Sequence, residues 1–339
     1  MYFKHPASPP GGDGQWNIRV RVGSTGPGGV FQEETYLAFS QVIYTYPSGT
    51  VGLNATDAID DRIAAANQAV DFKSVFSTRF HGSQQNPTPQ YIRNTSSWCY
   101  DLRQQMTCIS PWNSEGINLG AGTAITARHI VGAYHNRLPI DTSIRFITAN
   151  AGAGNAESVI TRTIIGRADH VGNDVSVYTL SASLPATITP CKILPANYGA
   201  YLSYLGGGRP PVMSLDQEEK ALVAELHLLS GIAEYAKPAF HTDRVPFYED
   251  IIPGDSGNPT FLIIKPPLVN DAALVLLSTF TFGGAGFGHF VTNLDPTLNA
   301  MIAAADADAI VNHPEFLSVN TGLQVEAVDL SGFSEFTPP

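Results

Sequence analysis

Short apolar or alternating runs separated by turns fill most of this chain from about residue 95 onward. Runs of this length, rich in β-branched and aromatic residues, predict strands rather than helices. The 339 residues also include 31 glycines and 24 prolines, which suit the many turns that short strands need. We therefore expect an all-β, loop-rich protein. The clearest predicted strands are Ile144–Ala149, Val159–Ile165, Val175–Leu180 and Leu274–Phe282.

Other parts of the chain add further predicted strands and two predicted helices. Residues 17–22 and 36–46 predict strands, and we interpret residues 215–229 as strand despite their polar start. Thr56–Val70 predicts a helix because acidic residues gather near its beginning, and residues 296–305 predict a short second helix. We see no internal repeat.

Charge and hydropathy argue against two classes of partner. The net charge is −11, so there is no basic surface to bind nucleic acid. The longest near-apolar run, Ala272–Phe282, is too short to cross a bilayer, and the first ten residues lack the apolar stretch of a signal peptide. We expect neither nucleic-acid binding nor membrane insertion.

The three cysteines leave two interpretations open. Cys99 and Cys108 could close one small disulfide loop and leave Cys191 free, or all three could be buried thiols. Their spacing is not that of a zinc site, and no histidine pair has metal-ligand spacing. We expect no metal and no cofactor.

Three short motifs carry the chemistry of this sequence. The first is Thr126-Ala127-Arg128-His129, the second is Asn173-Asp174 at the start of an alternating strand, and the third is Gly254-Asp255-Ser256-Gly257. A serine hydroxyl is a poor nucleophile unless a base removes its proton and a third group orients that base. His129, Asp174 and Ser256 are the residue types that supply these parts. Two alternatives remain: His135 as the base, and Gly254–Gly257 as an ordinary surface turn.

The order and surroundings of these residues resemble the chymotrypsin-like (trypsin-like) serine peptidases, over roughly residues 95–300. The matching segments are TARH, NDVSVYTL and GDSGNP. Two departures point to a bacterial or viral relative: Ile130 follows the histidine where animal enzymes have a cysteine, and no activating N-terminal segment is visible. A third, Asn258 in place of a glycine, bears on the local turn and not on the nucleophile.

The resemblance implies a double β-barrel and a serine endopeptidase that acts through an acyl-enzyme on protein or peptide substrates. His129, Asp174 and Ser256 would be catalytic, and the N–H groups of Gly254 and Ser256 would form the oxyanion hole. Asp250 would lie at the base of the specificity pocket and select arginine or lysine, with Phe282 and Gly283 on its wall. The alternative is that Asp250 is a solvated turn residue, because the bulky segment Ile251-Ile252-Pro253 follows it and the family's flanking cysteine is absent. Without an activating amine, Asp255 needs another partner, such as a backbone N–H or an internal side chain.

The same resemblance suggests a division of the chain. Residues 1–90 would be an N-terminal α+β extension and a possible attachment module, 91–305 the trypsin-like domain with its short C-terminal helix, and 306–339 a further extension. The unmatched N-terminal region keeps an alternative open: a peptidase-fold structural or binding module of a virion or cell-surface assembly. A secreted, surface or virion location fits both interpretations.

Overall fold

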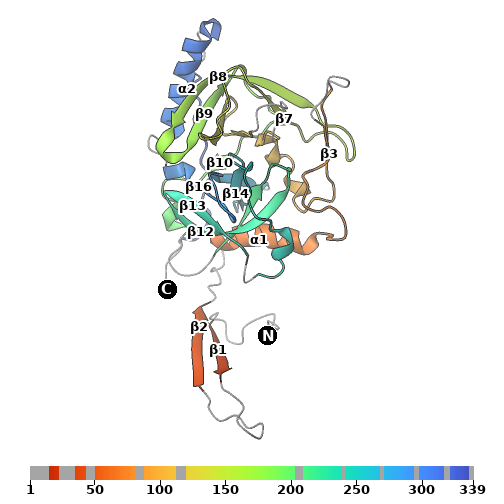
Figure 1. The fold of residues 1–339 in the computed structure, drawn as a ribbon, viewed down its shortest axis with the longest axis vertical. Coiled ribbons are helices and arrows are strands. Elements are labelled where there is room, and N and C mark those ends of the chain that lie inside the picture. The colour runs from red at the N-terminus through yellow and green to blue at the C-terminus, as the bar shows by residue number, and fades with distance from the viewer. Residues whose placement is uncertain are drawn as a thin grey trace.

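The computed structural model describes residues 50–80, 88–111, 120–202, 209–238, 241–267, 271–293, 298–316 and 321–335, and the backbone alone of 15–22 and 35–42. In this part of the chain the fold is mainly β, with two α-helices (Figure 1). This confirms the prediction of a β-rich, loop-rich protein. Two larger sheets carry most of the strands, and two further pairs are β1 (Gln15–Val22) with β2 (Thr35–Val42), and β3 (Phe76–Phe80) with β4 (Gln90–Arg93).

The first larger sheet has five strands in the order β5-β6-β9-β8-β7. The long strand β8 pairs with β7 through its first half and with β9 through its second half, and a register shift between Ile164 and Gly166 separates the halves. Such a bulge bends the strand, so the sheet curls. Its strands are β5 (Thr123–Ala124), β6 (His129–Ala133), β7 (Ser143–Ile147), β8 (Val159–His170) and β9 (Val175–Leu180).

The second larger sheet has seven strands in the order β10-β15-β14-β11-β12-β13-β16. Every pairing within it is antiparallel except the short parallel pair β10–β15. The segment that we interpreted as strand despite its polar start contributes β12 and the end of β11. The strands are β10 (Lys192–Ile193), β11 (Pro211–Leu215), β12 (Ala221–Ser230), β13 (Ile232–Ala236), β14 (Pro259–Ile264), β15 (Ala273–Thr279) and β16 (Phe287–His289).

Helix α1 (Val51–Ala65) begins and ends earlier than the sequence predicted. Thr50 is its N-cap, and its hydroxyl accepts a hydrogen bond from the Leu53 N–H at 3.3 Å. The helix therefore starts at this cap. The acidic residues that predicted a later start lie in the middle of the helix. Buried Arg244 anchors the helix to the second sheet through Asp60, at 2.7 and 2.8 Å, and through Glu225 on β12, at 3.0 Å.

Helix α2 (Leu298–Asn312) extends seven residues beyond the predicted end at residue 305. It packs along β8 and β9 (Figure 1). A Cβ built on Gly166 of β8 would lie 2.2 Å from the Ala305 carbonyl oxygen, so the absence of a side chain at Gly166 permits this close contact. The helix therefore runs across the boundary that we expected between residues 305 and 306.

The segment after α2 also packs on the core. Val328, Leu330 and Phe333 are buried, and Ile193 of β10 exchanges backbone hydrogen bonds with Glu326 and Val328 at 3.0 and 2.9 Å. Buried side chains form two large clusters. One contains residues from both larger sheets, and the other lies on the seven-stranded sheet beneath α1.

Candidate active site

His135 lies at the point where the pairing of β6 and β9 ends. These strands are antiparallel, with Ala133 opposite Val175 as the last pair of β6. The Tyr134 N–H then donates to the Asp174 carbonyl at 3.0 Å, and the His135 N–H donates to Asp174 Oδ1 at 2.8 Å. The register of two strands thus brings residues that are 39 positions apart into contact.

Asp174 is held in an unusual backbone conformation. Its φ and ψ are 51° and 39°, in the left-handed region, directly after the short 3-10 helix Val171–Asn173. Asp and Asn tolerate this region better than most other residues. The carboxylate makes a second contact with His135, because Oδ2 lies 2.6 Å from the imidazole Nδ1. The two hydrogen bonds from His135 to the Asp174 carboxylate therefore fix both the imidazole ring and the backbone of His135.

Ser256 completes a continuous chain of hydrogen bonds. The other imidazole nitrogen of His135, Nε2, lies 2.7 Å from the Ser256 Oγ. The His135 side chain is 42% exposed and that of Asp174 is 14% exposed, so solvent reaches the imidazole more readily than the carboxylate. An imidazole in this position can take the serine proton, while the carboxylate stabilises the imidazolium that forms.

The structure corrects the histidine chosen from the sequence. His129 does not contact Ser256: its Nε2 lies 2.9 Å from Asp306 Oδ1 on α2, and its Nδ1 lies 2.7 Å from the Thr126 hydroxyl. His129 is fully buried at the start of β6, whereas His135 follows the end of that strand in a polar turn. The physical reason is position on the strand, because the residue past the end of β6 meets the loop that carries Asp174. No local sequence signal separates His135 from His129, because the pairing of β6 with β9 determines which histidine meets Asp174.

The turn that carries Ser256 depends on two glycines. Gly254 and Gly257 have φ values of 111° and 86°, which side chains disfavour. A Cβ on Gly254 would also lie 2.5 Å from Gln217 Oε1. The Gly257 N–H donates to the Phe280 carbonyl at 3.0 Å, which ties the turn to the segment that follows β15.

Buried Asp255 holds this turn from beneath. Its two carboxylate oxygens each accept a backbone N–H at 2.8 Å, Oδ1 from Gln217 and Oδ2 from Ile252. Of the two kinds of partner expected for Asp255, a backbone N–H or an internal side chain, the structure shows backbone N–H groups. Burial raises the pKa of this carboxyl group, while the two N–H groups act in the opposite direction.

The turn around Ser256 also carries the two backbone amides that the resemblance assigns to an oxyanion hole. Within the described residues, the N–H groups of Gly254 and Ser256 have no hydrogen-bond acceptor. Amide donors of this kind can stabilise a developing oxyanion. The expected pair is therefore available for that role.

The residues expected to form a specificity pocket do not line a buried pocket in the structure. The Asp250 side chain is 55% exposed and already forms an ion pair with Lys237 at 2.7 Å. It also accepts a hydrogen bond from the Tyr248 hydroxyl at 2.7 Å, and these two partners lower its pKa. Phe282 is 64% exposed and packs edge-on against Phe287. Gly283 follows it with a φ of 94°.

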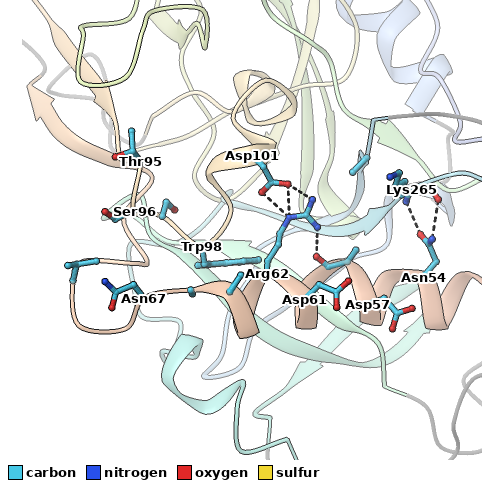
Figure 2. A pocket seen from close by; sticks show the side chains of 16 residues that line it. Asn54, Asp57, Asp61, Arg62, Asn67, Thr95, Ser96, Trp98, Asp101 and Lys265 are labelled. Carbon is cyan, nitrogen blue, oxygen red and sulfur yellow. Dashed lines mark hydrogen bonds and ion pairs between the residues drawn. The ribbon is translucent and has the colours of Figure 1, made fainter.

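A cavity of about 780 Å³ lies along α1, lined by residues other than His135, Asp174 and Ser256. Figure 2 shows Arg62 reaching from the helix to Asp101, with Asp57 and Asp61 on the same helix. Asn54 and the backbone of Lys265 exchange hydrogen bonds at its other end. In the part of the chain that the structure describes, no group of three or more His, Cys, Asp or Glu side chains is placed to hold a metal ion, and neither α-helix combines the length and apolar character of a membrane span.

No model of a known protein family and no curated protein matches this chain.

Proposed function

We propose that this protein is a serine endopeptidase in which Ser256 is the nucleophile, His135 the general base and Asp174 the group that orients His135. The observation that carries the proposal is the unbroken set of hydrogen bonds from the Asp174 carboxylate through both imidazole nitrogens to the Ser256 hydroxyl, at 2.6 and 2.7 Å. The three residues occur in the order His, Asp, Ser, as in the trypsin-like enzymes that the sequence resembles.

The proposed reaction proceeds in two halves. Ser256 Oγ attacks the carbonyl carbon of a peptide bond while His135 Nε2 takes its proton, and the amides of Gly254 and Ser256 stabilise the oxyanion. His135 then gives the proton to the leaving amine. Water, activated by the same imidazole, hydrolyses the acyl-enzyme and frees Ser256.

The proposal extends to the fold. We propose that the five-stranded and the seven-stranded sheet correspond to the two barrels of a trypsin-like domain, with the active site between them. His135 and Asp174 follow and precede strands of the five-stranded sheet, and Ser256 precedes β14 of the seven-stranded sheet. A site built from both sheets agrees with this assignment.

A fluorophosphonate probe tests the function directly, because it modifies a serine only when that serine is activated. We expect the intact chain to be labelled at Ser256, with the adduct located by peptide mapping. Ser256→Ala and His135→Ala should abolish labelling. Cleavage of an unfolded protein substrate, blocked by the probe, would then separate a peptidase from an esterase.

The same experiment distinguishes the alternative function, a peptidase-fold binding module of a larger assembly. A module of this kind would be folded but inert toward the probe. Absence of labelling in a protein with a cooperative unfolding transition would reject the peptidase proposal. Labelling that persists in Ser256→Ala would reject the assignment of the nucleophile.

A further inference from the structure

Two of the three cysteines, Cys108 and Cys191, are neighbours in the core. Cys108 ends the 3-10 helix η2 (Gln105–Cys108), and Cys191 directly precedes β10. Both are buried, and all three cysteines of the chain are free thiols. Both belong to the same cluster of buried side chains, although 83 positions separate them in the sequence.

A set of hydrogen bonds holds the two cysteine-bearing segments side by side. The Thr189 N–H donates to the Thr107 hydroxyl at 2.8 Å, and Gln104 Nε2 donates to the Thr189 hydroxyl at 3.0 Å. Both segments are also fixed to β5: Ile109 forms a β-bridge with Thr123, and the Cys191 N–H donates to the Ala124 carbonyl at 2.9 Å. The backbone therefore places the two cysteine-bearing segments next to each other.

Cys99 is in a different environment. Its Sγ lies 3.7 Å from the sulfur of Met106 and 3.5 Å from the Ser97 hydroxyl. The pairing of Cys99 with Cys108, which the sequence left open, is not present in the structure.

We propose that Cys108 and Cys191 form an oxidisable pair, which a small-molecule disulfide converts into an intramolecular disulfide bond. Cys191 reacts first, since it is 4% exposed while Cys108 is fully buried. Cys191 also lines a cavity of about 460 Å³, through which a small reagent can approach.

The chemistry is thiol–disulfide exchange in two steps. The Cys191 thiolate attacks one sulfur of the small disulfide, whose S–S bond breaks and releases a thiolate that takes up a proton. The Cys108 thiolate then attacks the Cys191 sulfur of the mixed disulfide and releases the second small thiol. Two cysteine thiols are oxidised, and one small disulfide is reduced to two thiols.

Burial determines how fast this reaction runs. Removal from water raises the pKa of the Cys191 thiol well above its usual value. The reactive thiolate is therefore scarce at neutral pH, and we expect slow oxidation that accelerates with pH. The disulfide bond would join the segment before β5 to the residue before β10, an edge strand of the seven-stranded sheet. It would also constrain the unfolded chain.

The test uses the folded full-length chain and 2-hydroxyethyl disulfide. After acid quenching, we expect an intact mass lower by two hydrogens, a Cys108–Cys191 peptide on mapping, and a melting temperature raised by several degrees. Cys99→Ser, the matched control, should be oxidised in the same way. Cys108→Ser should stop at a mixed disulfide on Cys191. Circular dichroism establishes that each variant is folded.

Two outcomes would overturn the proposal. One is a disulfide that contains Cys99. The other is a folded protein whose thiols stay reduced under conditions that oxidise the urea-unfolded chain. Ser256→Ala should be oxidised like the wild type, so this result is independent of the proposed peptidase activity.

Discussion

Two histidines six residues apart have opposite surroundings, and their roles follow from them. His129 is sealed inside the protein between Thr126 and Asp306, so its proton cannot reach a substrate. His135 is half-exposed and lies between a carboxylate and a serine hydroxyl. Removing each imidazole should therefore affect different properties of the protein.

Our first prediction contrasts these two residues. His135→Ala should lower the rate of peptide hydrolysis by roughly 10⁴-fold or more, with an unchanged melting temperature. His129→Ala leaves Asp306 buried without its imidazole partner and should lower the free energy of unfolding by about 3–5 kcal/mol. Steady-state kinetics and urea unfolding measure the two effects.

A conservative variant controls for loss of folding. His129→Gln retains an amide that can donate to Asp306, so it should be folded and active. Loss of activity in His129→Gln without loss of stability would contradict our assignment of the histidines.

The second prediction at this scale concerns Asp250. Its charge is already matched by Lys237, and its side chain is mostly in solvent. We expect Asp250→Ser to change the selectivity among substrates that differ only before the scissile bond by less than about threefold, because an exposed ion pair contributes little free energy. A preference for arginine or lysine that disappears in Asp250→Ser would instead restore its role as a pocket base.

Among the elements, α2 depends on a close backbone contact. Gly166→Ala would force a methyl group toward the Ala305 carbonyl and the Ala309 backbone, which cannot move away independently of the helix. We expect a loss of about 1–3 kcal/mol or more in the free energy of unfolding, measured in urea. Gly199→Ala is the control, because a Cβ there meets nothing within 4 Å. Equal stability of the two variants would show that α2 adjusts freely.

The turn between β11 and β12 provides a pH-dependent element next to the serine turn. Burial, with a smaller contribution from nearby Asp255, raises the pKa of Asp216 from 3.8 to about 6, although backbone N–H groups oppose the shift. Between these values the folded state holds more protons than the unfolded state, so stability falls as pH rises and stays lower above pH 6.

Asp216→Asn tests the direction of this pH dependence of stability. Both hydrogen bonds from Glu218 and Lys220 end on Oδ1, which an asparagine oxygen can replace. The variant should be more stable than the wild type at pH 8, by about 1–3 kcal/mol, and most of this difference should be lost at pH 4. Urea unfolding at both pH values measures it. A gain that is equal at the two pH values would assign the effect to something other than the charge.

For the whole molecule, the support beneath Ser256 comes from within the fold. Asp255 is satisfied by the N–H groups of Gln217 and Ile252, so a newly cut chain end is not required to hold the turn. The intact chain should therefore react with a fluorophosphonate at the same rate as protein that has been nicked near residue 95. Time courses of labelling before and after limited proteolysis measure this. Labelling that begins only after cleavage would contradict the prediction.

The sequence by itself determined the β-rich character of the fold, the strand at Val175–Leu180 and the glycine-flanked turn around Ser256. These features are local, because alternation of apolar residues and the backbone freedom of glycine act over a few positions. The expectation that Asp255 would find partners inside the protein also held, since a buried carboxylate must have partners. Helix limits were less predictable, as the cap at Thr50 shows.

Only the tertiary structure decided which side chains meet. The register of β6 against β9 placed His135 beside Asp174 and directed His129 toward α2. The fold likewise places Asp250 beside Lys237, and it places Cys108 and Cys191 in one buried cluster. Each contact joins residues that are not neighbours in the sequence, and its geometry depends on strand pairing and packing that no local pattern encodes.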